Sequence, residues 1–177
     1  MREDRKSLSR ITECAVFACV ALIIFAVEAC VPIPVAIPGV KLGLANVVTL
    51  AAVYIIGKRE TLMILIVRII LGNIFTGQAV SLIYSLTGGI FCYIITVALK
   101  SFFKGKNIWA LGTIGAIFHN FGQLLCAYLM LGSGSLVYYG LVLTAAACVT
   151  GTFTGLCAQY VILHNQKYLK GNKKYDY

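Results

Sequence analysis

The stretch Ile108–Leu131, IWALGTIGAIFHNFGQLLCAYLML, contains no Asp, Glu, Lys or Arg. A helix needs about 20 mostly apolar residues to cross a bilayer, so this stretch is predicted to be a membrane-spanning helix. The whole chain has the same character, because 60% of its 177 residues are hydrophobic and only 12% are charged. Soluble domains carry about twice as many charges. We therefore expect an all-α, polytopic membrane protein.

Five further apolar stretches flank this one, and two of them, the second and third, are short for a crossing. The sequence thus predicts a bundle of six transmembrane helices within residues 11–164. Residues 1–10 are expected to form a cytoplasmic N-terminal segment, and residues 165–177 a cytoplasmic tail. The six predicted helices are Ile11–Val31, Leu42–Gly57, Thr61–Phe75, Ser81–Leu99, Ile108–Leu131 and Leu136–Leu163.

The positions of the cations predict the orientation of this bundle. All but two of the 15 Lys and Arg residues fall into four groups, within residues 2–10, 58–59, 100–106 and 167–174. With six crossings these four regions share one side, and the positive-inside rule places that side in the cytoplasm. We expect a multi-pass protein of the bacterial cytoplasmic membrane. The net charge of +9 reflects topology, and because the cations form no continuous face it does not indicate nucleic-acid binding.

Polar residues at membrane depth are the candidate binding residues. Charges at mid-bilayer cost about 2.5 to 3.5 kcal/mol, so Arg68 is expected to face a partner, a cavity or a pathway. His119 and Gln123 have i, i+4 spacing and share one helix face. We expect an outward-facing, water-accessible pocket that binds a small molecule with an anionic or polar group. Its predicted residues are Lys41, Asn46, Arg68, Asn73, His119, Asn120 and Gln123.

Simpler roles for these residues remain open at this stage. Arg68 is expected to pair with Glu28 or with a carbonyl group, and an ion pair with Glu28 could serve stability alone. Glu28 and Lys41 could also be solvated near the membrane surface. A lone intramembrane histidine such as His119 is often a hydrogen-bonded packing residue.

Small residues predict where helices approach closely. Gly151 and Gly155 form a GxxxG pattern in the last span, and Ala15 and Cys19 form a small pair in the first. Such sites serve packing inside the bundle or docking of another membrane subunit.

Catalysis has little support in the sequence. There is no GxSxG, HExxH or Walker motif, and no DDxxD-type motif that could hold magnesium and a diphosphate. The seven cysteines show no CxxC spacing, and we expect neither a metal nor a cofactor. Any active transport would therefore draw on a gradient or on a partner ATPase.

Three motifs, taken in order, resemble the Gx transporter family, which is often labelled heptaprenyl diphosphate synthase component I. They are Pro38-Gly-Val-Lys-Leu-Gly-Leu-Ala-Asn46, Arg68-Ile-Ile-Leu-Gly72 and Gly115-Ala-Ile-Phe-His-Asn-Phe-Gly-Gln123, and the resemblance covers residues 10–165. That family is similar in size and topology to the substrate-binding S components of energy-coupling factor (ECF) transporters, which partner a T subunit and two ATPases.

This resemblance implies an S-component-like bundle that binds its substrate on the outer side. It also implies docking of a T subunit on the small-residue face of the first span, at Ala15, Ala18 and Cys19. The label suggests an alternative, a membrane accessory of polyprenyl (heptaprenyl) diphosphate or quinone metabolism. The family also resembles a component found with flavin-linked extracellular electron transfer, which implies a third role, in an assembly for such electron transfer.

Overall fold

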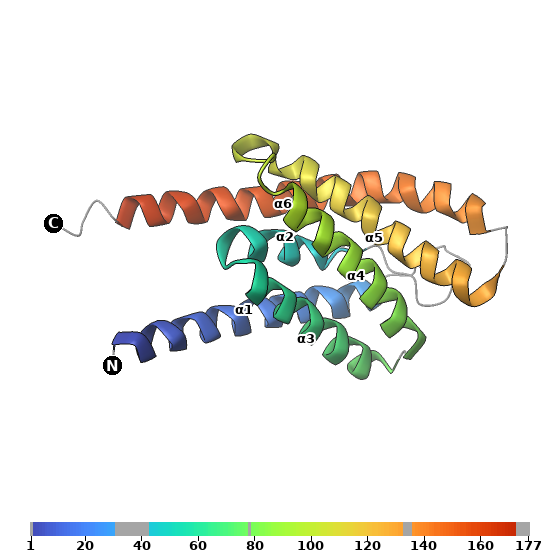
Figure 1. Ribbon diagram of the computed structural model, residues 1–177. Helices are drawn as coiled ribbons and strands as arrows, with labels where there is room; N and C mark the ends of the chain where they lie inside the picture. Colours follow the sequence, from blue (N-terminus) through green and yellow to red (C-terminus); the bar gives the residue numbers. More distant parts are fainter. Residues whose placement is uncertain (1, 31–42, 78, 133–135, 173–177) are drawn as a thin grey trace.

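The computed structural model describes residues 2–30, 43–77, 79–132 and 136–172, and within these ranges it is all-helical, as predicted. Figure 1 shows the helices as one elongated bundle. The elements are α1 (Arg2–Cys30), α2 (Asn46–Ile55), α3 (Lys58–Thr76), α4 (Ala79–Leu99), the 3-10 helix η1 (Gly105–Asn107), α5 (Ile108–Leu131) and α6 (Leu136–Asn172).

Four described segments are long and apolar enough to cross a membrane: Leu8–Cys30, Val80–Leu99, Gly105–Leu131 and Gly140–Lys167. The α3 helix has 19 residues and so approaches the thickness of the hydrocarbon core, but it carries several charges. The structure therefore supports a polytopic membrane protein, whereas the six crossings stay a prediction.

The second predicted span, Leu42–Gly57, is longer than the helix observed there. The helix begins only at Asn46, after a turn in which Gly43 has a φ of +78°, and it has 10 residues. At 1.5 Å per residue α2 is about 15 Å long, roughly half the thickness of the hydrocarbon core. A helix of this length does not cross the membrane by itself.

The α2 helix lies in the interior of the bundle and contacts every other helix (Figure 1). Ala45, Ala52 and Val53 are fully buried, because small and β-branched side chains let the surrounding helices approach closely. The first turn of α2 therefore starts inside the protein, and Asn46 is 7% exposed.

Both chain termini extend from the same end of the bundle, at the left of Figure 1, where the α2–α3 and α4–α5 connections also lie. The described cations of these segments, among them Lys58, Lys100 and Lys167, belong to this end. This arrangement matches the alternation of charged and apolar segments, and the cytoplasmic location of that end stays a prediction. Residues 2–10 continue α1, and α6 extends to Asn172, so both segments flanking the predicted domain are at least partly helical.

The glycines of the last two helices pack against each other within this chain. A Cβ atom on Gly112 of α5 would lie 2.5 Å from the Cα atom of Gly155 in α6. A Cβ atom on Gly151 would lie 2.8 Å from the Cα atom of Thr113, and the hydroxyls of Thr113 and Thr152 are 3.1 Å apart. The predicted GxxxG pattern thus serves internal packing of α5 against α6.

Candidate functional site

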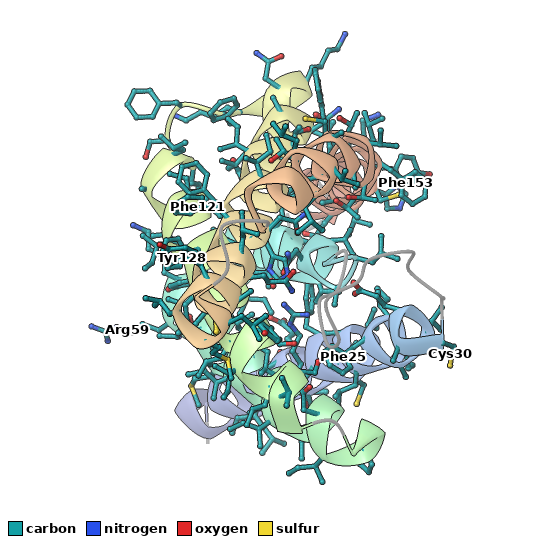
Figure 2. All side chains as sticks on the ribbon, turned by 90° about the vertical axis from the view of Figure 1, so that its right-hand side faces the viewer. Phe25, Cys30, Arg59, Phe121, Tyr128 and Phe153 are labelled. Atoms are coloured by element: carbon teal, nitrogen blue, oxygen red, sulfur yellow. The ribbon has the colours of Figure 1, made fainter. Side chains whose placement is uncertain are left out.

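A group of buried polar side chains lies where α1, α2, α3 and α5 meet, and we call it the polar cluster. In Figure 2, nitrogen and oxygen atoms lie in the interior of the bundle beside the ribbon of α2. Each member is at most 7% exposed, so all of them are withdrawn from the protein surface. The members are Glu28, Asn46, Arg68, His119 and Gln123.

Glu28 and Arg68 supply the charges of the polar cluster. The backbone N–H of Gly43 donates to Glu28 Oε1 at 2.5 Å, and the Arg68 guanidinium donates to Asn46 Oδ1 at 2.9 Å. The charge of Glu28 also acts electrostatically on Arg68, and the ion pair between them stays a prediction. Opposite charges buried together stabilise each other, whereas either alone would be costly.

His119 and Gln123 supply the neutral part of the polar cluster. Their Nε2 atoms are 3.0 Å apart, as expected for side chains one helical turn apart. Gly88 of α4 packs against both residues, since a Cβ atom there would lie 2.8 Å from the His119 carbonyl oxygen and 2.9 Å from Gln123 Cγ. The closeness of α4 thus holds these two side chains in place.

Gly43 joins the two parts of the polar cluster. A Cβ atom on this residue would lie 2.7 Å from Asn46 Nδ2 and 2.9 Å from His119 Cδ2. Gly43 is part of the first family motif, but sequence reasoning did not select it as a site residue. The signal was present in the pattern Gly-Val-Lys-Leu-Gly, because a second glycine directly before a helix often marks a turn with positive φ.

The remaining predicted site residues have different surroundings. Asn120 Nδ2 donates to the carbonyl oxygen of Leu143 at 2.8 Å, so this side chain links α5 to α6. Asn73 Nδ2 donates to the carbonyl oxygen of Ile69 at 2.7 Å in its own helix. Lys41 lies outside the described residues. The structure therefore brings Asn46, Arg68, His119 and Gln123 together, with Glu28 beside them.

Several buried polar atoms of the polar cluster have no hydrogen-bond partner among the residues that the structure describes. They are Asn46 Nδ2 and Arg68 Nε, which are donors, Gln123 Oε1, which is an acceptor, and His119 Nδ1, whose role depends on the tautomer. A buried polar atom without a partner costs about 1 to 3 kcal/mol. Donors and acceptors in one small volume can be satisfied by a polar molecule that offers both kinds of group.

We expect Gly43→Ala to disturb the polar cluster. The new methyl group would meet Asn46 and His119, and the positive φ of Gly43 is unfavourable for alanine. The expected result is a loss of about 1 to 3 kcal/mol in unfolding free energy, measured by thermal unfolding in detergent micelles. Gly132→Ala is the matched control, because Gly132 also has a positive φ but a Cβ atom there would meet nothing within 4 Å. Equal destabilisation by both changes would contradict close packing at Gly43.

The outer surface of the bundle is largely apolar. Figure 2 shows Phe121, Tyr128 and Phe153 pointing away from it, and each is more than half exposed.

On α1, the predicted docking residues Ala15 and Cys19 are exposed and Ala18 is half-buried. Among the described residues no group of three or more His, Cys, Asp or Glu side chains could hold a metal ion.

The apolar surface and the polar cluster together define a helical membrane protein with a hydrogen-bonding site inside its bundle. The chain belongs to the heptaprenyl diphosphate synthase component I family, whose model matches residues 17–161. This confirms the family expected from the three sequence motifs, all of which lie in the matched range. Searches of curated proteins and of solved structures gave no match.

Proposed function

We propose that this protein is the substrate-binding membrane subunit of an ECF-like importer and that the polar cluster holds its ligand. The observation that carries the proposal is the convergence of Asn46, Arg68 and Gln123 from three helices. Each has a buried polar atom for which the described residues offer no hydrogen-bond partner. Packing alone would favour apolar side chains at these positions, because polar atoms inside a membrane protein are costly to bury.

The charges of the polar cluster narrow the chemistry of the ligand. Glu28 and Arg68 are opposite in charge and act on each other, so the described part of the cluster has no large net charge. A small polar molecule fits better than a strongly anionic one. It would accept hydrogen bonds from Arg68 Nε and Asn46 Nδ2 and donate to Gln123 Oε1.

Transport also requires an energy source, and the sequence contains no nucleotide-binding motif. In this proposal a T subunit and its ATPases supply the energy. The exposed small residues Ala15 and Cys19 of α1, with Ala18 beside them, form the docking face.

Native mass spectrometry of the protein purified from its host membranes tests the proposal, because it reports ligand and partners together. We expect a polar small molecule to accompany the wild type and to be reduced about tenfold or more in Gln123→Leu, since this change removes an acceptor that the ligand would use. Gln159→Leu is the matched control, because Gln159 accepts a hydrogen bond from the backbone of Trp109 and lies outside the polar cluster. Purification with neither a ligand nor an ATPase would contradict the importer.

The family description favours a second candidate, a membrane accessory of heptaprenyl diphosphate synthesis. This role predicts that deletion of the gene changes the prenyl lipids of the cell and that Gln123→Leu does not. An importer predicts that neither change alters the prenyl lipids and that Gln123→Leu reduces the bound ligand. Lipid extracts of the deletion strain, compared with wild type, therefore distinguish the accessory from the importer. A role in an electron transfer assembly predicts neither a change in the prenyl lipids nor a bound ligand.

A further inference from the structure

A pocket with several lysines lies at the end of the bundle that carries both termini, away from the polar cluster. Its volume is about 540 Å³, and Lys58, Lys100 and Lys104 line it together with Tyr54, Ser101 and Gln166. These residues come from α2, α3, α6 and the connection after α4. None of the described residues that line it is acidic, so these residues give the pocket a positive potential that favours anions.

Lys100 is held at the wall of this basic pocket. Its Nζ donates to the carbonyl oxygen of Val53 at 2.7 Å and lies 5.1 Å from the centre of the Tyr54 ring. Burial and the neighbouring charge of Lys58 lower the pKa of Lys100. An ammonium group has three donors, so Lys100 can bind an anion while it keeps its bond to Val53.

Two helix N-termini also lie at the basic pocket. Lys58 begins α3, whose N-cap has no side-chain hydrogen bond. Ile108 begins α5, where the side chain of Gln159 already accepts a hydrogen bond from the N–H of Trp109. The first N–H groups of a helix attract anions, because they lack partners within the helix and carry the positive end of its dipole. The lysines therefore supply most of the attraction for an anion, because Glu60 lies in the first turn of α3 and Gln159 bonds the first turn of α5.

An apolar groove lies between α1, α2 and α6, farther from the chain termini than the basic pocket. Its volume is about 270 Å³, and its walls include Phe17, Val20, Val47, Ala51, Ala158 and Val161. The groove is open at the outer surface of the protein, where the membrane would supply hydrocarbon chains.

The groove and the basic pocket lie along the same faces of two helices. On α2, Val47 and Ala51 line the groove and Tyr54 lines the pocket, at i, i+4 and i+7. On α6, Ala158 lines the groove and Gln166 lines the pocket, two turns apart on one face. At 1.5 Å per residue these separations are about 10 to 12 Å, which is less than the length of an acyl chain.

We propose that this surface binds an anionic membrane phospholipid, with its phosphate in the basic pocket and an acyl chain in the apolar groove. The pocket alone would suit any phosphate, but the groove beside it selects a phosphate that carries a hydrocarbon chain. Lys58 and Lys104 act as the exposed contacts to the headgroup, and Lys100 contributes the fixed one.

The test uses the full chain in nanodiscs that contain either phosphatidylglycerol in phosphatidylcholine or phosphatidylcholine alone, with bound lipid counted by native mass spectrometry. We expect selective retention of phosphatidylglycerol by the wild type. Lys58→Gln combined with Lys104→Gln should reduce retention about fivefold per lysine, because a cation at a membrane surface contributes about 1 kcal/mol. Both side chains are exposed, so the variant should fold. Lys106→Gln, in the same connection but outside the pocket, is the charge-matched control.

A second variant tests the apolar part. Ala51→Phe should fill the groove and reduce retention of phosphatidylglycerol several-fold, whereas Val149→Phe on the exposed face of α6 should not. Equal retention of both lipids, or an effect of Lys106→Gln as large as that of the double variant, would overturn the proposal. A third result would also overturn it: inorganic phosphate binds as strongly as the lipid, and Ala51→Phe does not change lipid retention. The site would then be one for free phosphate. Gln123→Leu should leave lipid retention unchanged, which keeps this result separate from that for the importer.

Discussion

Replacing Arg68 by methionine is expected to destabilise the protein by about 3 to 5 kcal/mol, the largest effect of any single change considered. The substitution leaves the carboxylate of Glu28 buried, at 2% exposure, without the cation that acts on it. It also removes the donor to Asn46 Oδ1 and so disturbs the start of α2. Thermal unfolding in detergent micelles, followed by circular dichroism, measures the loss.

A double-mutant cycle separates the charge effect from lost packing. Glu28→Gln still accepts the N–H of Gly43 but carries no charge, so the variant with Glu28→Gln and Arg68→Met should recover part of the stability lost in Arg68→Met alone. Arg59→Met is the matched control, because Arg59 is exposed at the start of the same helix. Additive effects of the two changes would show that Glu28 and Arg68 are not coupled.

Replacing Gly112 by leucine is expected to separate α5 from α6 and to cost about 3 kcal/mol or more. Already the first carbon of the new side chain would lie 2.5 Å from the Cα atom of Gly155, and neither backbone can move without breaking contacts at Gly151 and Thr113. Overpacking of a close interface typically costs 1 to 3 kcal/mol, and here a backbone atom opposes the insertion. The measurement is the midpoint of thermal unfolding together with the yield of monodisperse protein in detergent.

Cys157→Leu provides the control for this substitution. Cys157 is exposed on α6 two residues after Gly155, so a larger side chain there should point into the surrounding hydrocarbon and change the midpoint little. If Gly112→Leu were as stable as Cys157→Leu, the close approach of α5 and α6 would be wrong.

Much of the polar cluster could be predicted from the sequence, because charged and amide residues in apolar stretches are rare and stand out. Arg68, His119 and Gln123 were found in this way, and the cost of an isolated buried charge predicted a partner such as Glu28 for Arg68. Asn120 shows where this reasoning fails. It is adjacent to His119 but points to Leu143 of α6, since successive residues on a helix differ by about 100° in direction.

The basic pocket shows a different limit. Lys58, Lys100 and Lys104 were interpreted as topological signals, which explains their side of the membrane but not their proximity to one another. Lys58 and Lys100 are separated by two helices, α3 and α4, and only the packing of those helices places both lysines at one pocket.

The sequence by itself determined that this chain is a helical membrane protein, which face of α5 is polar and which segments carry the cations. These properties follow from hydrophobicity and helical period, which act locally along the chain. The tertiary structure decided that α2 is a short interior helix, that Gly43 joins Glu28 to His119, and that the glycines of α5 and α6 face each other. Such contacts form between segments that are distant in the sequence. They depend on side-chain volumes and backbone turns, whose effects combine only when the helices pack against each other.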